Sequence, residues 1–370
     1  MNRVRASLAS VIRRIVIAGI CVISFSGVSH AQIDTDPPGA VFVLSNQPTE
    51  NSVIAYARSS EGVLTWAGTY PTGGKGAGTG ADPLGSQGSL TLGSGFLFAV
   101  NPGSNDVSMF AVDGAKLKLL DRVSSGGKMP VSVAIKDFVV YVLNAGDTPT
   151  ISGYIIDALG KRLIPLPNSQ RLLAGGRSAQ PAQVTFSPDG DELVVTEKGT
   201  QLIDTYRVDF LGYTSGPYRH ASNGVTPFGV SVTNRNYALV AEAGSGAVST
   251  YLIRDPAHLE ALSSSVPLGQ TATCWIVTTG DGRFAFTANA GSGTISSLSV
   301  GADGTTRALN PVAAVVSAPL DMALSRNSQF LYVRQGSGAL EGFRVLPDGS
   351  LSDVGTVTGI PANGQGVAAR

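Results

Sequence analysis

Two glutamates, Glu197 and Glu242, occupy equivalent positions of a repeated motif in which the other copies carry an amide. The seven equivalent residues are Asn46, Asn101, Asn144, Glu197, Glu242, Asn289 and Gln335. Two carboxylates from neighbouring repeats could act as a general base and a charge stabiliser. Alternatively, each side chain accepts backbone hydrogen bonds from the glycine turn that follows it. Glu197 and Glu242 are therefore candidate catalytic residues.

A second group of polar residues opens the strands that precede these motifs. Gln183 is the third catalytic candidate, because its amide could polarise an ester carbonyl. Trp275 could form one wall of a ligand pocket. The alternative for this group is that it only holds water at the mouth of a channel. The residues expected to bind a ligand are Gln87, Asn101, Lys128, Asn144, Trp275, Asn289, Asp321 and Gln365.

No metal site and no cofactor is expected. Calcium would suit a ring of carboxylate and amide oxygens, but these positions end strands that lie one strand away from the axis. The glycine run from Gly73 to Gly80 matches neither GxxxxGK[ST] nor GxGxxG. A quinone or haem propeller is disfavoured because CxxCH and ligand histidines are missing. Cys274 would need a base, and His220 and His258 are expected on outer-strand or hairpin segments.

The elements that position these residues repeat along the chain. Successive motif residues are 55, 43, 53, 45, 47 and 46 residues apart. A period of about 40 to 50 residues with several short strands per unit is typical of a β-propeller. Each repeat contains an inner strand, the motif strand, an alternating third strand and a polar fourth strand. The sequence therefore predicts an all-β, seven-bladed propeller with four antiparallel strands per blade.

The two ends of the chain predict how the ring closes. The first repeat begins at its second strand, at Val41, and the C-terminus carries a spare inner-strand segment that begins at Pro361. Pairing this segment into blade one removes the free sheet edges of an open array. Turns after the second strands and crossovers between blades should share one face, called the top face here, where sites are expected.

The first 31 residues have the features of a signal peptide. Arg3, Arg5, Arg13 and Arg14 precede an apolar run from Ile15 to Phe25, and Ser29 and Ala31 supply the small residues for cleavage. We expect a signal peptide over residues 1–31, a short tail over 32–38 and one propeller over 39–370. An uncleaved membrane anchor is the alternative. The protein is thus expected to be periplasmic or secreted.

Composition narrows the partners of the exported chain. Removing residues 1–31 takes away four arginines and no acid, which leaves 22 basic and 26 acidic residues and a net charge of −4. Without a basic cluster, we expect neither nucleic acid nor membrane binding, and we expect a monomer. Charged residues are 14% of the chain, below the roughly 25% of soluble domains. Strands packed on both faces account for this.

The repeats, together with the stretches Pro181-Ala-Gln-Val-Thr-Phe-Ser-Pro-Asp-Gly and Val195-Thr-Glu197, resemble the seven-bladed lactonase propellers. That family includes bacterial 6-phosphogluconolactonase and fungal carboxymuconate cyclase. The resemblance covers roughly Gly39 to the end and implies that Glu197 matches a family glutamate. The family's arginine and histidine positions hold Ala182 and Gln183, and the export signal is a second departure, so a phosphorylated sugar is not the implied substrate.

The resemblance implies a lactone hydrolase or a lactone-forming cyclase. Glu197 would act as general base on water at the top-face channel mouth, assisted by Glu242, with Gln183, Gln87 or Lys128 polarising the ester carbonyl. The partner would be a small-molecule lactone. The alternative is a non-catalytic exported propeller that binds a ligand or a protein through the same face.

Overall fold

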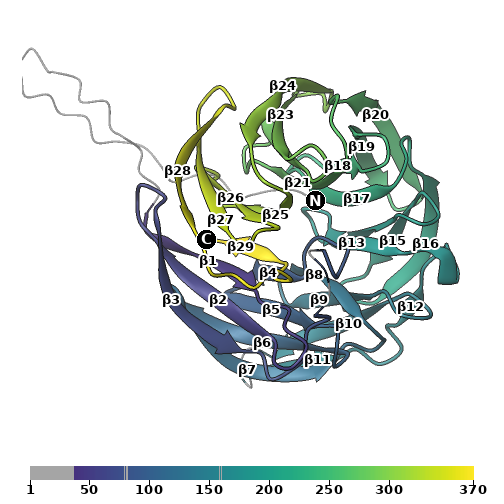
Figure 1. Ribbon diagram of the computed structural model, residues 1–370. Helices are drawn as coiled ribbons and strands as arrows, with labels where there is room; N and C mark the ends of the chain where they lie inside the picture. Colours follow the sequence, from purple (N-terminus) through teal and green to yellow (C-terminus); the bar gives the residue numbers. More distant parts are fainter. Residues whose placement is uncertain (1–36, 79, 81, 158, 160) are drawn as a thin grey trace, which may run out of the picture. The chain divides into compact units, whose positions relative to one another are not determined.

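The computed structural model describes residues 37–370 except 79, 81, 158 and 160. These residues form seven antiparallel sheets, or blades, in a ring (Figure 1). The predicted seven-bladed propeller is therefore confirmed. The expected signal peptide, and most of the expected tail, lie outside the described residues. Within residues 37–370, no helix is long and apolar enough to cross a membrane.

The strands follow one another from the axis outward in each blade, with the inner strand first. Blade one contains β29 (Val367–Ala369), β1 (Gly39–Leu44), β2 (Ser52–Arg58) and β3 (Leu64–Pro71). Blade two contains β4 (Leu90–Gly93), β5 (Phe96–Asn101), β6 (Asp106–Asp113) and β7 (Lys116–Ser124). Blade three contains β8 (Pro130–Lys136), β9 (Val139–Asn144), β10 (Thr150–Asp157) and β11 (Arg162–Pro165), with the short β12 (Arg171–Leu172) also paired to β10.

The remaining blades keep the same order. Blade four contains β13 (Pro181–Phe186), β14 (Glu192–Glu197), β15 (Leu202–Val208) and β16 (Thr214–Ala221), and the 3-10 turn η1 (Gly176–Ser178) precedes it. Blade five contains β17 (Pro227–Val232), β18 (Tyr237–Glu242), β19 (Ala247–Asp255) and β20 (His258–Pro267). Blade six contains β21 (Thr273–Thr278), β22 (Phe284–Asn289), β23 (Thr294–Val300) and β24 (Thr306–Val315). Blade seven contains β25 (Pro319–Leu324), β26 (Phe330–Gln335), β27 (Leu340–Val345) and β28 (Leu351–Val357).

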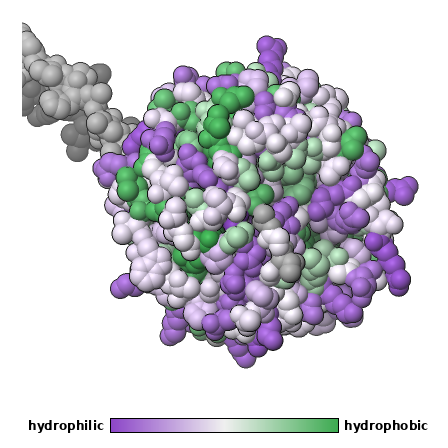
Figure 2. Space-filling model, in the orientation of Figure 1, coloured by the Kyte–Doolittle hydropathy of each residue, from purple (hydrophilic) through white to green (hydrophobic). Residues whose placement is uncertain are grey.

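Burial is greatest in the second strand of each blade and falls toward the outer strand, and the residue types follow it. Second strands such as β22 are buried along almost their whole length because neighbouring blades cover both of their faces. Outer strands such as β16 are mostly exposed and carry more polar residues. The face of the molecule in Figure 2 accordingly shows apolar side chains only in small separate groups among polar ones. The hydrophobic core thus lies between adjacent blades.

The C-terminal strand β29 closes the ring by pairing with β1 (Figure 1). Val43 lies opposite Val367, and Val41 lies opposite Ala369. The amide of Arg370 donates to the carbonyl of Ala40 at 2.9 Å. Every residue of β1 beyond Gly39 is buried, so the predicted closure removes an apolar edge that would otherwise be free.

The same turn leads into the inner strand of blades three to seven. The residue before the strand is not glycine, yet it has a positive φ between 45° and 61°; the five residues are Met129, Gln180, Thr226, Ala272 and Ala318. The carbonyl of each accepts the amide N–H of the residue that follows the blade's motif residue, at 2.8–3.2 Å. The residue that opens each inner strand, such as Pro181, therefore pairs with the motif residue, here Glu197. This geometry positions the motif residues of these five blades.

Candidate functional site

The motif residue Glu242 anchors the crossover that leads into its blade. Its Oε1 accepts the amide N–H of Gly224 at 2.9 Å, and its Oε2 accepts the hydroxyl of Ser265 at 2.7 Å. The hydroxyl of Ser249 also donates to Oε1. The carboxylate is fully buried. Its backbone donor comes from the preceding crossover, and not from the following glycine turn that the sequence suggested.

Glu197 occupies the same position in blade four but has an acidic neighbour. Its carboxylate accepts the amide N–H of Gly175 at 3.0 Å and the hydroxyl of Thr200. Asp204 lies opposite Val195 on the adjacent strand β15, and hence on the same face as Glu197. Burial and a hydrogen bond with Glu197 raise the pKa of Asp204 to about 8. Asp204 is therefore protonated at neutral pH, beside the carboxyl group of Glu197.

The hydrogen-bonding pattern of Asp204 agrees with that assignment. Its Oδ2 accepts the amide N–H of Ala174 at 2.8 Å. Its Oδ1 is buried and has no donor among the described residues. A carboxyl oxygen that carries the proton needs an acceptor and no donor, and the neighbouring Glu197 side chain can supply that acceptor. Both carboxyl groups lie behind the half-buried Ala174–Gly175 segment.

The asparagines among the candidates hold the turns of their own blades. Asn101 Nδ2 donates to Asp106 and Ser108, and its Oδ1 accepts the hydroxyl of Thr72 at 2.6 Å. Asn289 makes the corresponding contacts in blade six, where its Nδ2 donates to Ser296 at 2.8 Å. The remaining candidate at a motif position, Asn144, donates to the carbonyl of Ser125 at 3.0 Å. All three are fully buried. They serve as links between strands in this structure.

A different group of candidates meets at the axis, around residues 82–88, which we call the axial loop. This loop belongs to the crossover from β3 to β4. The backbone N–H of Gln87 donates to the carbonyl of Ala182. Its side-chain NH₂ donates to the carbonyl of Ile276 at 2.8 Å, and its side-chain oxygen accepts the amide N–H of Ile276 at 3.0 Å. The loop therefore links blades two, four and six across the top end of the inner strands.

Two other candidates hold the same loop in place. The indole N–H of Trp275 donates to the carbonyl of Ser86 at 2.9 Å, and Trp275 is almost fully buried. Gln365 donates to the same carbonyl at 3.0 Å and accepts the amide N–H of Leu84 at 3.1 Å. The top mouth of the channel, where the sequence predicted a ligand, is thus crossed by the chain itself.

Asp321 lies at the start of β25, at the junction of blades seven and one. Its two carboxyl oxygens accept the amide N–H groups of Met322 and Val367, at 2.8 and 3.1 Å. Burial raises its pKa to about 7. Asp321 therefore ties the closing strand β29 to blade seven and titrates near neutral pH.

Charged residues that the sequence analysis did not single out lie close to these candidates. Arg334 is fully buried and donates to the carbonyls of Pro361 and Ala362 at 2.9 and 2.6 Å. Its Nε and Nη1 have no acceptor among the described residues. The ammonium of Lys198 donates to Gly85 of the axial loop and lies 4.9 Å from the centre of the Phe228 ring. Burial lowers the pKa of Lys198.

The sequence contained a signal for one of the missed residues. Asp204 comes seven residues after its motif residue, where three other repeats have Ser108, Ser249 and Ser296. An acid at a position where three other repeats have serine could have been noticed by aligning the repeats. No comparable pattern indicates Arg334, whose partners lie 27 and 28 residues later in the chain.

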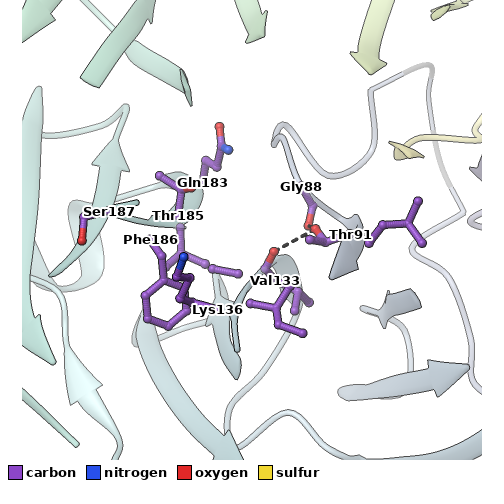
Figure 3. A pocket seen from close by; sticks show the side chains of 12 residues that line it. Gly88, Thr91, Val133, Lys136, Gln183, Thr185, Phe186 and Ser187 are labelled. Carbon is purple, nitrogen blue, oxygen red and sulfur yellow. Dashed lines mark hydrogen bonds between the residues drawn. The ribbon is translucent and has the colours of Figure 1, made fainter. Parts of the chain in front are cut away.

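Gln183 borders a pocket in the channel beyond the axial loop. The pocket has a volume of about 220 Å³ and extends along β8 and β13 to Lys136 and Ser187 at their far ends. Figure 3 shows Gln183 and Thr185 on one side and Thr91 on the other. The Oε1 of Gln183 accepts the amide N–H of Val230 at 2.7 Å. The hydroxyl and amide groups that line this pocket suit a small polar ligand.

Of the remaining candidates, Lys128 and the two histidines lie away from the Glu197–Asp204 pair and from the axial loop, whereas Cys274 lies near Asp82 of that loop and Lys198. Lys128 is exposed and forms an ion pair with Asp147 at 3.0 Å. His220 lies on β16 and His258 on β20, both outer strands. Burial raises the pKa of the Cys274 thiol to about 12, so it is not a thiolate at neutral pH. Among the described residues, no cluster of three His, Cys, Asp or Glu side chains could hold a metal ion.

Comparisons with known proteins identify the fold. No family model and no curated protein matches the sequence. Among solved structures, a protein from Lactobacillus plantarum superimposes with a TM-score of 0.71 and 19% identity over 89% of this chain and 98% of its own. A Bacteroides fragilis protein proposed to be a 6-phosphogluconolactonase gives 0.67 and 16% over 90% and 98%. The Pseudomonas aeruginosa periplasmic gluconolactonase gives 0.65 and 17% over 89% and 99%. At these identities the likeness establishes a shared propeller fold.

Proposed function

We propose that this chain is an exported lactonase-like propeller that hydrolyses, or forms, a small lactone on its top face. The observation that carries the proposal is the Glu197–Asp204 pair. Among the seven equivalent hairpins of the described chain, only that of blade four places two carboxyl groups together. The raised pKa of Asp204 suits it to act as an acid at neutral pH, and Glu197 beside it could act as the base.

The pair can serve both halves of lactone hydrolysis. Glu197 takes a proton from water as the oxygen of that water bonds to the lactone carbonyl carbon. The ring C–O bond then breaks, and its oxygen takes the proton of Asp204. A proton passing from Glu197 to Asp204 through their hydrogen bond restores the starting state. The Ala174–Gly175 segment donates hydrogen bonds to both carboxyl groups and covers them. A substrate therefore reaches the pair only when this segment moves aside.

The test uses a matched pair of variants. Glu197→Gln and Glu242→Gln change equivalent positions of adjacent blades, and only the first removes a carboxylate with an acidic neighbour. Purified mature protein is assayed against a panel of aldonolactones and enol lactones. The proposal expects a loss of about 100-fold or more in kcat for Glu197→Gln and a small effect for Glu242→Gln. Equal rates for wild type and Glu197→Gln would remove Glu197 from the mechanism.

A binding role without catalysis is the second candidate function. It is favoured by the axial loop, which crosses the top mouth of the channel, and by the complete hydrogen bonding of Glu242. This alternative expects no turnover of any lactone by the wild type. It also expects a ligand to protect the protein against thermal unfolding to the same extent in wild type and Glu197→Gln.

A further inference from the structure

A groove lies at the outer side of the junction between blades one and seven, away from the top-face site. Its volume is about 400 Å³, within the range of small-molecule sites, roughly 300–1,000 Å³. Blade one contributes Ile54, Tyr56, Trp66 and Thr69, and the chain from Thr356 to Gly359 contributes the opposite wall. None of these lining residues is charged.

The pairing of β2 with β3 explains why an aromatic ring faces this groove. Trp66 lies opposite Tyr56, and Thr69 lies opposite Ile54. Directly opposed residues share a face of the sheet, and this face packs against blade seven through Ile54 and Tyr56. Trp66 itself is 64% exposed. An indole ring is therefore held by a rigid strand with its surface open to solvent.

Three hydroxyl groups line the groove together with the indole. Thr69, Thr356 and Thr358 are all exposed. None of the three makes a side-chain hydrogen bond to another residue in the described part of the chain. Each can donate one hydrogen bond and accept others.

The two strand edges beside the groove are irregular. A bulge in β3 shifts the register between Ala55 and Tyr56, and β28 has a shift of its own opposite Gly342 and Phe343. Gly355 and Gly359 have φ values of 120° and 95°. Such backbone does not present the even row of N–H and C=O groups that an added peptide strand needs. The groove thus suits a ring-shaped ligand better than an extended peptide.

We propose that this groove binds a neutral carbohydrate, with the C–H face of a sugar ring stacked on Trp66 and sugar hydroxyls bonded to Thr69, Thr356 and Thr358. An aromatic ring with one exposed face provides the apolar contact, neutral hydroxyls provide orientation, and the absence of charge in the lining favours a neutral ligand over an acidic or basic one. The site is independent of the lactone chemistry proposed for Glu197.

The experiment uses the two tryptophans of the chain. Trp66 is exposed and Trp275 is buried, so emission at long wavelength reports on Trp66. Maltose and cellobiose are titrated into the mature protein, with sodium glucuronate as the charged comparison, and calorimetry measures affinity independently of fluorescence. We expect saturable binding of a neutral disaccharide, about tenfold weaker binding by Thr358→Ala (about 1.4 kcal/mol) and loss of binding by Trp66→Ala.

Two controls separate this site from the top face. Glu197→Gln should bind the sugar like the wild type, and Trp66→Phe should show no sugar-dependent change in the remaining Trp275 emission. Co-sedimentation with insoluble starch or cellulose distinguishes a polysaccharide from a free sugar as the source of the ligand. Absence of saturable binding for both disaccharides, or equal affinities for wild type and Trp66→Ala, overturns the proposal. So does tighter binding of glucuronate than of the neutral sugars.

Discussion

Asp204 and Glu197 lie on the same face of paired strands, and burial together with a hydrogen bond to Glu197 raises the pKa of Asp204 to about 8. In the next blade the equivalent of Asp204 is Ser249, whose hydroxyl donates to Glu242. The same backbone hairpin therefore holds an ordinary hydrogen bond in one blade and a titrating acid pair in the other. This contrast allows the acid pair to be tested against an internal control.

The acid pair should make stability depend on pH. The pKa of Asp204 is about 8 in the folded protein and about 3.9 when unfolded. The folded state then binds more protons between these values, so this contribution is full below about pH 4 and is lost as pH rises to about 8. The stability advantage of Asp204→Asn over the wild type should therefore be small at pH 5 and larger by several kcal/mol at pH 9. Urea unfolding at both pH values measures this.

Two other aspartates provide comparisons for that measurement. Asp321 has a pKa raised by burial to about 7, so a smaller fall of the same sign should remain in Asp204→Asn. Asp303 is an exposed residue whose pKa is lowered by hydrogen bonds from Thr305, and Asp303→Asn should show no gain at pH 9. A wild type and an Asp204→Asn variant with parallel pH profiles would contradict the raised pKa of Asp204.

The contact between Gly224 and Glu242 should be intolerant of any side chain. A Cβ at Gly224 would overlap the buried Glu242 carboxylate, which three hydrogen bonds hold in place. Gly224→Ala should therefore lower the free energy of unfolding by about 1–3 kcal/mol or more, measured by chemical denaturation. Gly280→Ala is the control, because its Cβ would meet only Ser328 at 3.7 Å. Similar losses in both variants would contradict the argument.

The axial loop should depend on the side chain of Gln87. Gln87→Ala leaves the buried N–H and C=O groups of Ile276 without their partners, at a cost of about 1–3 kcal/mol for each group. We expect faster deuterium uptake by residues 82–88, followed by mass spectrometry. Gln47→Ala, which removes a hydrogen bond to Asn363 outside this loop, should leave that uptake unchanged. Unchanged uptake in both variants would mean that other contacts hold the loop.

Ring closure should be sensitive to one amide N–H. Val367→Pro removes the donor that Asp321 Oδ2 accepts, whereas Val367→Ile keeps the N–H and an apolar side chain. We expect the proline variant to melt several degrees lower than the isoleucine variant, measured by circular dichroism. Equal melting temperatures would show that Asp321 does not secure β29.

Much of the fold could be predicted because its causes are local and repeated. The spacing of the motif residues, the buried second strands and the prolines that open inner strands each recur within a single blade. The pairing of Val367 with Val43 could be predicted because the first repeat lacks an inner strand and the C-terminus carries a spare one. Such features follow from periodicity and from the need to pair sheet edges.

What the sequence determined alone was therefore the ring, its closure and the positions of the motif residues. Tertiary structure decided what those residues contact. Only in the folded chain does Gln87 reach Ile276, 189 residues away, and only there does the chain after β28 face Trp66 across a groove. Periodicity describes each blade by itself, whereas these contacts join irregular crossovers to distant blades. Their geometry depends on loop lengths and on packing around the axis, which no single repeat encodes.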